Sequence, residues 1–373
     1  MKKFFYLAAA LSVLLAGCTK SITSGNPERE ISFQTAGYAT KLGIPGPEFP
    51  TDETFGVFSW TDAAPGTYFM DNEVVAYQES GLWKTDVKYK WPAHNTVDFF
   101  CFYPAQMKEI TVGETKVSYA DYDVEANPDT DVMYADKDVA FADFPEDVPG
   151  SVSGYDGVPA VFHHALAKLA VDVVLAYNHK KEADGTVTDW SVTVNSATLQ
   201  GVYKKGGCEL NLAASPEIGL VGWDKPKGNV WTNDGSFFAQ KNLVSAPVTL
   251  ATEPLALVPE MFVLPQNLAA GQQKVALNIT IKTKRNGADV LSETFDVAAD
   301  LLVPDKLEAW QMNHSVTYRL TVYPIRSNGN GGNPEDPDNP VDPSDPDLSD
   351  ATIRFAPAVG GWDAVDVTAT IKL

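Results

Sequence analysis

The chain consists of short segments rich in β-branched and aromatic residues, and this pattern limits the folds that the chain can adopt. Many segments alternate apolar and polar residues, which is typical of strands with one buried face. The 25 prolines and 27 glycines suit many turns between such strands. After residue 18, no stretch carries a sustained apolar stripe at helical spacing. The pattern predicts an all-β chain of antiparallel β-sandwiches. The clearest predicted strands lie at 74–77, 96–103, 161–175, 190–198, 261–264, 275–281 and 316–323.

The N-terminus has the organisation of a bacterial lipoprotein signal peptide. Two lysines precede an apolar run at 4–16, which is too short to span a bilayer as a helix but suits a signal peptide. Leu15-Ala16-Gly17-Cys18 resembles a lipobox, in which the signal is removed before a diacylated cysteine. We therefore expect a signal peptide at 1–17 and lipid attachment, including palmitate, at Cys18, with the acyl chains anchoring the protein to its membrane. The alternative is an ordinary secretory peptide with a chance cysteine.

Composition also suggests how the rest of the chain is divided. A stretch rich in Pro, Gly and Asp at 141–157 precedes a new predicted strand at Val161, so a domain boundary is expected there. The predicted parts are a tether at 18–29, an N-terminal β-sandwich at 30–158, a C-terminal β-sandwich at 160–326, a linker at 327–349 and a C-terminal extension at 350–373.

The linker and the extension differ in composition and in the structure that they predict. Residues 327–349 carry a proline at every third position from 334 to 346 and six acidic residues without a basic one, which predicts an extended, solvated spacer. In the extension, apolar and polar residues alternate along 363–372, as in a strand with one apolar face. The apolar members are Val365, Val367, Ala369 and Ile371. Because so short a segment cannot form its own core, it is expected to dock elsewhere.

Charge and motifs argue against several function classes. The net charge of −21 would repel phosphate backbones, so no nucleic-acid partner is expected. His163 and His164 are neighbours on a predicted strand and point to opposite faces, so they cannot chelate one ion together. Asp121, Asp123 and Glu125 begin a calcium-loop spacing that lacks its glycine and its final glutamate, which favours a solvated acidic loop. We predict no catalytic residue, no metal site and no cofactor.

Two cysteines remain after Cys18. Cys101 lies in an aromatic segment and is expected to be a buried thiol. Cys208 follows Gly206 and Gly207, which are expected to form a turn. A disulfide between the two cysteines stays open at this point, because sequence distance does not determine spatial distance.

Several short sequence motifs resemble those of the fimbrillin family of lipoproteins in their order and spacing. Together they extend over nearly the whole mature chain. They lie at 55–58, 98–104, 131–135, 164–169, 171–173, 263–266, 318–322 and 353–362. Family members often carry glycine in the turn before the late tyrosine strand, where this chain has Asn313. Asparagine tolerates positive φ, so we expect the turn to persist.

The resemblance implies two transthyretin-like β-sandwiches and a pilus subunit that assembles by strand exchange. In such subunits an external protease removes the first strand, and the C-terminal strand of the next subunit fills the vacated groove. The leaving strand would be 30–40, with Ile31, Phe33 and Thr35 inward. Cleavage would follow Lys41, which precedes a Pro- and Gly-rich stretch at 42–54 expected to be an exposed loop, or else Arg29. The donor strand would insert Val365, Val367, Ala369 and Ile371, unless the tail folds back onto its own second domain.

A structural or accessory subunit of a surface pilus that serves adhesion is therefore the expected function, with the stalk, anchor and tip roles all open. Its expected partners are other pilus subunits and, through the lipid anchor, the outer membrane, with host or bacterial surface ligands as further candidates. The expected location is the cell surface, as an outer-membrane lipoprotein, a component of the fimbrium, or both. The alternative is a surface glycan-binding lipoprotein that uses exposed aromatic side chains. Nothing in the sequence predicts an enzyme.

Overall fold

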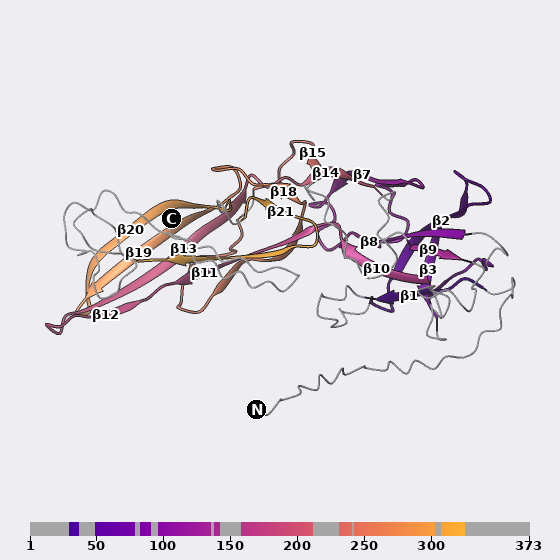
Figure 1. Cartoon of the computed structure of the whole chain (residues 1–373). Coiled ribbons are helices and arrows are strands. Elements are labelled where there is room, and N and C mark those ends of the chain that lie inside the picture. Colours follow the sequence, from indigo (N-terminus) through magenta and orange to yellow (C-terminus); the bar gives the residue numbers. More distant parts are fainter. Residues whose placement is uncertain are drawn as a thin grey trace, which may run out of the picture.

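The computed structural model of the chain describes residues 30–36, 49–78, 83–90, 96–135, 138–141, 158–211, 231–240, 242–302 and 307–324. Within these ranges every regular element is a β-strand, which confirms the all-β prediction. The same ranges contain no helix that is long and apolar enough to cross a membrane. The molecule is elongated, with one group of strands around β1–β3 at one end and another around β11–β13, β19 and β20 at the other (Figure 1).

The first sheet has eight strands in the order β2-β3-β4-β1-β10-β8-β5-β9. Because β2 also pairs with β5, seven of these strands close into a ring. The first core fills this ring and includes Phe33, Phe55, Val97 and Phe99. The strands are β1 (Phe33–Ala36), β2 (Thr54–Thr61), β3 (Tyr68–Tyr77), β4 (Trp83–Thr85), β5 (Thr96–Tyr103), β8 (Met133–Ala135), β9 (Asp138–Phe141) and β10 (Val158–His164).

The second sandwich has two sheets that enclose the second core, which contains Trp190, Ile279, Trp310 and Tyr318. One sheet has the order β17-β11-β22, in which β22 runs parallel to β11. The other has the order β12-β13-β19-β20, with β16 also paired to β13. The strands are β11 (Ala167–Leu175), β12 (His179–Lys181), β13 (Val187–Gln200), β16 (Val248–Thr249), β17 (Leu255–Val263), β19 (Lys274–Arg285), β20 (Ala288–Asp300) and β22 (Ser315–Val322).

Between the two ends lies a junction sheet with the order β15-β14-β7-β6. The strand β14 (Lys205–Asn211) follows β13 of the second sandwich, yet it pairs with β7 (Lys116–Asp123), which follows the first-sheet strand β5 and the short strand β6 (Ile110–Val112). This pairing connects the two halves of the chain through backbone hydrogen bonds. The remaining short strand of this sheet is β15 (Thr232–Asn233), and β18 (Gln266–Asn267) and β21 (Ala309–Trp310) form a separate pair.

The change from the first sheet to the second sandwich comes later along the chain than the predicted boundary at 158–160. The strand β10 (Val158–His164) pairs with β1 and β8 and so belongs to the first sheet. Ala165 and Leu166 then lie fully buried in a third cluster, the junction core, and β11 begins at Ala167. The junction core also contains Phe58, Trp60, Tyr119 and Trp231. Sequence pattern could not separate β10 from β11, because both are apolar runs and their partners lie far away in the chain.

Asn313 has φ = 62°, which confirms that asparagine adopts the left-handed conformation in the turn before β22. The expected turn at Gly206 and Gly207 is wrong, since both lie within β14. A Cβ atom on Gly207 would lie 2.2 Å from the Tyr119 carbonyl oxygen of the neighbouring strand, so only glycine lets these strands approach so closely.

Candidate functional site

The strand β1 lies between β4 and β10 in the ring. It pairs in parallel with β10 over Phe33–Ala36, and Phe33 pairs with Trp83 of β4 on the other side. The Val158 N–H donates to the Ser32 carbonyl at 2.7 Å, and the Ile31 N–H donates to the Tyr89 carbonyl at 2.9 Å. The first strand therefore supplies backbone hydrogen bonds to both sides, and its removal would leave partners on both sides unsatisfied.

The side chains of this strand are anchored in the first core. Ile31 is 1% exposed and Phe33 is 0% exposed. The Phe33 ring meets Phe55 edge to face, with ring centroids 5.9 Å apart, and meets Phe99 in the same way at 5.6 Å. Thr35 pairs with Ala160 through its backbone, while its side chain lies outside the description. We use the term β1 groove for the space that Ile31 and Phe33 fill.

One aromatic residue of the first core that surrounds the β1 groove was not predicted as part of the site. Phe49 lies in the 42–54 stretch that was expected to be an exposed loop, but it is buried and its ring packs on Trp83 at 5.4 Å and on Phe162 at 4.9 Å. The exposed-loop expectation is therefore wrong at this residue. A lone phenylalanine between prolines was the one available signal, since an aromatic residue in a polar loop usually packs against something.

Polar groups around the β1 groove are paired. The Lys84 ammonium contacts the Glu30 carboxylate at 3.0 Å, next to the start of β1. Tyr89 donates to Glu73 at 2.6 Å, and burial together with this carboxylate raises the pKa of Tyr89 to about 12. Burial, followed by the nearby Glu53, likewise raises the pKa of Tyr103 to about 12. Both phenols therefore stay neutral and able to donate hydrogen bonds well above neutral pH.

The other predicted site residues lie outside the described residues. They are Cys18, Arg29, Lys41, Val365, Val367, Ala369 and Ile371. Their roles remain predictions from the sequence.

Asp121, Asp123 and Glu125, which begin the incomplete calcium-loop spacing, form ion pairs at the junction. The Lys204 ammonium contacts Glu125 at 2.8 Å and Asp123 at 3.8 Å, and Lys205 contacts Asp121 at 3.7 Å. Lys205 begins β14 and Lys204 precedes it, while Glu125 follows β7, so the contacts link the two halves of the chain. Asp121 and Asp123 were expected in a solvated acidic loop, but they lie within β7.

Both cysteines carry thiols and lie in different cores. Cys101 is buried in the first core, inside the ring. Cys208 packs against the junction core, where burial raises its pKa far above the ordinary value. They do not pair with each other, which answers the question that the sequence left open.

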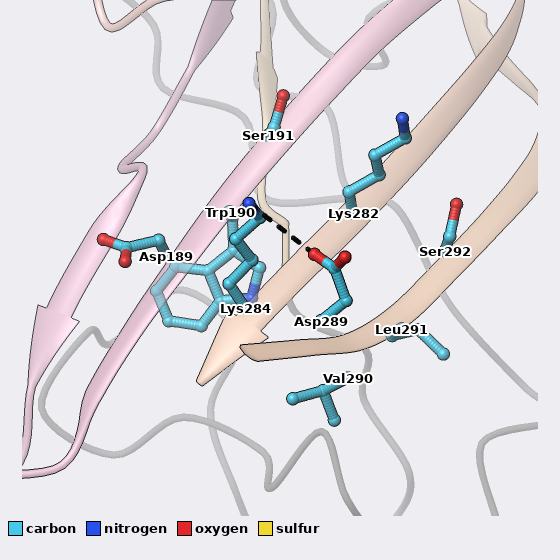
Figure 2. A pocket seen from close by; sticks show the side chains of 9 residues that line it. All are labelled: Asp189, Trp190, Ser191, Lys282, Lys284, Asp289, Val290, Leu291 and Ser292. Atoms are coloured by element: carbon cyan, nitrogen blue, oxygen red, sulfur yellow. Dashed lines mark ion pairs between the residues drawn. The ribbon is translucent and has the colours of Figure 1, made fainter. Parts of the chain in front are cut away.

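A hollow of about 680 Å³ lies over β13, β19 and β20. Figure 2 shows the side chains that line it. Lys284 and Asp289 face each other across it at 3.7 Å. Trp190 is the one aromatic residue among those that line the hollow, but it is 5% exposed and packs against Tyr177 at 5.6 Å. Because its ring is covered, the hollow offers no flat aromatic face for a sugar to stack on.

Comparison with known proteins supports the fold and identifies the family. A fimbrial protein of Bacteroides vulgatus is 15% identical to this chain, with a TM-score of 0.53 over 90% of this chain and 100% of that chain. A candidate cell adhesion protein of Bacteroides eggerthii is 13% identical, with a TM-score of 0.41 over 91% of this chain and 98% of that chain. The fimbrial anchor protein Mfa2 of Porphyromonas gingivalis is 11% identical, with a TM-score of 0.30 over 79% and 90%.

Of these three, the first alone is similar enough to indicate a shared fold, and at 15% identity it indicates nothing beyond the fold. No curated protein sequence matches the chain. The fimbrillin-like family matches residues 40–334, which is most of the chain and includes every described strand after β1. The fimbrillin resemblance of the sequence is thereby confirmed, and the family is one of fimbrial structural proteins rather than enzymes. The chain belongs to the fimbrillin-like family.

Proposed function

We propose that this chain is a structural or accessory subunit of a surface pilus, assembled by protease-triggered strand exchange and serving adhesion. Family membership supports the fimbrial and adhesive part of this proposal. The observation that carries the mechanism is the position of β1, a four-residue strand that closes the ring between β4 and β10. Because β1 is short, it could dissociate from the sheet. Because its buried side chains are apolar, its loss would expose an apolar groove.

Loss of β1 would expose apolar side chains without packing partners and strand edges without hydrogen-bond partners. The rings of Phe55 and Phe99 would lose their contacts with Phe33, and burial of one such side chain contributes about 1.5–3 kcal/mol. The facing edges of β4 and β10 would lose their hydrogen-bond partners. An open edge beside an apolar groove favours the addition of another strand, which supplies both hydrogen bonds and side chains.

A requirement for external proteolysis would keep exchange from beginning before export. While β1 is covalently attached, it competes for its groove at an effective concentration in the roughly millimolar range. A strand from another subunit cannot easily displace it. Cleavage after Lys41 would convert β1 into a short separate peptide, whereas cleavage after Arg29 would leave β1 attached to the ring. Lys41 is therefore the site that we propose for release.

Strand direction supports assembly in a head-to-tail chain. In the parallel pair of β11 and β22, Val322 lies opposite Leu175, near β12. Figure 1 places β12 and β1 at opposite ends of the molecule. The segment that follows β22 thus starts far from the β1 groove of its own subunit. A contact between two different ends of identical subunits can repeat from one subunit to the next, and it generates a filament when its rotation does not close into a ring.

The proposed attachment of the subunit to the outer membrane is the acylated Cys18. Two or three acyl chains on one residue would give stable anchoring, since each buried methylene contributes about 0.8 kcal/mol. Whether the anchor is kept or lost with the cut N-terminus would separate an anchor from a stalk subunit.

Controlled cleavage tests the proposal. The mature chain from Cys18, made without acyl groups, is treated with a lysine-specific endoprotease and followed by intact mass and by gel electrophoresis without heating. We expect a cut after Lys41, release of the peptide that carries β1, and a ladder of oligomers that heating dissolves. The variant Lys41→Gln is the matched control and should give no ladder. Clean release of β1 from a chain that stays monomeric would refute strand exchange.

A further inference from the structure

We propose that the segment that replaces β1 is residues 352–355 of a second copy of this chain, with Ile353 in the place of Ile31 and Phe355 in the place of Phe33. This inference rests on the proposed strand exchange and names the part of the tail that carries it out. It differs from the assignment of the donor to the alternating segment at 363–372.

The β1 groove accepts two apolar side chains of different size. Ile31 and Phe33 are separated by one residue, so both point to the same face of the strand, and both are fully buried. The larger position is shaped by aromatic rings, because Phe55 and Phe99 each present an edge-to-face contact to Phe33. An incoming strand that satisfies this groove needs an aromatic side chain two residues after an aliphatic one.

The C-terminal extension repeats this pattern with identical apolar residues. The first strand reads Glu30-Ile31-Ser32-Phe33, and the tail reads Thr352-Ile353-Arg354-Phe355. In the same register, Ile353 and Phe355 would restore the volume and the ring contacts that the departing strand removes. The exchange would then leave no cavity in the first core.

The alternating segment at 363–372 matches the groove less well. Its inward residues are Val365, Val367, Ala369 and Ile371, all of which are smaller than phenylalanine. Any of them in the place of Phe33 would leave a void beside Phe55 and Phe99. The register with Val365 and Val367 inward would also set Asp366 in the place of Ser32, which is 7% exposed, and a carboxylate is costly to bury there.

Two other residues of the proposed donor fit the neighbouring strands. Arg354 would stand in the place of Ser32, where its aliphatic stem can lie along the sheet while the guanidinium reaches water. Pro357 would stand in the place of Thr35. Because Ser32 accepts the bond from Val158, alternation directs the N–H of Thr35 away from β10. A proline there costs no hydrogen bond to β10.

The chain between β22 and the proposed donor is long enough for exchange between subunits. Residues 325–351 in an extended polyproline conformation span about 80 Å, at about 3.1 Å per residue. In the sequence, only two residues separate the predicted spacer at 327–349 from the proposed donor. The occupant of the β1 groove would thus be the tail of the next subunit.

Single charges placed in each candidate donor provide the test. Phe355→Asp and Val367→Asp are compared in the chain from Cys18 after the lysine-specific cut, which leaves Arg354 intact. We expect Phe355→Asp to abolish the oligomer ladder and Val367→Asp to preserve it, while both variants unfold at the temperature of the parent before cleavage. Arg354→Ser is the matched control in the same segment and should keep the ladder. A ladder from Phe355→Asp together with none from Val367→Asp would overturn this inference and leave strand exchange standing.

A peptide assay gives an independent readout. A synthetic peptide of residues 350–360 should bind the cleaved chain and end ladder growth, whereas the same peptide with Phe355→Ala should bind roughly a hundredfold more weakly. Equal binding of the two peptides would overturn the assignment of Phe355. If β1 leaves and neither a ladder nor peptide binding follows, the β1 groove is not open to a strand from another subunit, and the proposed exchange between subunits fails together with this inference.

Discussion

Phe33 of β1 meets Phe99 of β5 edge to face, with ring centroids 5.6 Å apart and an interplanar angle of 88°. The residues belong to strands that are not neighbours in the sheet, since β10 and β8 lie between them in one direction. The contact therefore crosses the interior of the ring. It connects the first strand to the opposite side of the ring, so we expect Phe33 to contribute to the closure of the ring.

Replacement of Phe33 with alanine tests this contribution. We expect Phe33→Ala to lower the free energy of unfolding by about 3–5 kcal/mol, because it leaves a cavity bounded by Phe55 and Phe99. Equilibrium denaturation measures the change. Val87→Ala, at a residue that is 53% exposed, is the control and should change stability by less than about 0.5 kcal/mol. Equal stability of both variants would mean that β1 contributes little to the first core.

Gly56 gives a second prediction about the ring. A Cβ atom at this position would lie 2.2 Å from the Phe102 ring, so Gly56→Ala must displace an aromatic side chain that is fully buried. We expect a loss of about 1–3 kcal/mol in denaturation experiments. At Gly113 the added Cβ would meet its nearest atom at 3.4 Å, so Gly113→Ala should be tolerated. A wild-type stability for Gly56→Ala would show that the Phe102 ring can move aside.

The junction between the two halves predicts a third effect. The Trp231 indole N–H donates to the Ala165 carbonyl at 3.0 Å, and the indole stacks on Tyr119 with centroids 5.6 Å apart. Trp231→Phe keeps a ring in place but leaves a buried carbonyl without this donor, so we expect a loss of about 1–3 kcal/mol. Tyr177→Phe, at a half-buried tyrosine outside the junction, is the comparison. Separate unfolding transitions of the two halves in Trp231→Phe would indicate that this residue couples them.

Alkaline titration gives a fourth prediction. Tyr89 and Tyr103 have pKa values raised to about 12, whereas an unfolded tyrosine titrates near 10. In this interval the folded chain binds more protons than the unfolded chain, so the stability that these phenols contribute is complete below pH 10 and is lost as pH approaches 12. Tyrosinate absorbance should show a late-titrating fraction, which Tyr103→Phe and Tyr89→Phe each reduce. Titration of all tyrosines near pH 10 in the folded protein would contradict this prediction.

Local pattern was enough to predict the fold class and several details of the fold. The alternation of apolar residues in 316–323 predicted a strand, and β22 (Ser315–Val322) is that strand. The resemblance to the family, whose members often carry glycine in this turn, allowed a positive φ to be expected at Asn313, because asparagine tolerates that conformation. These features depend on neighbouring residues alone, so the sequence by itself determines them.

Tertiary structure decided which strands meet. Phe55 and Val57 of β2 face the first core while Phe58 and Trp60 face the junction core, so this strand is buried on both sides, and its lack of clear alternation follows from that. The parallel pairing of β1 with β10 and the pairing of β14 with β7 join segments that are far apart in the chain. No local period encodes such partners, because the choice depends on the shape and closure of whole sheets. The family resemblance of the sequence thus predicted a strand that could leave the subunit. The tertiary structure determined the groove that this strand fills.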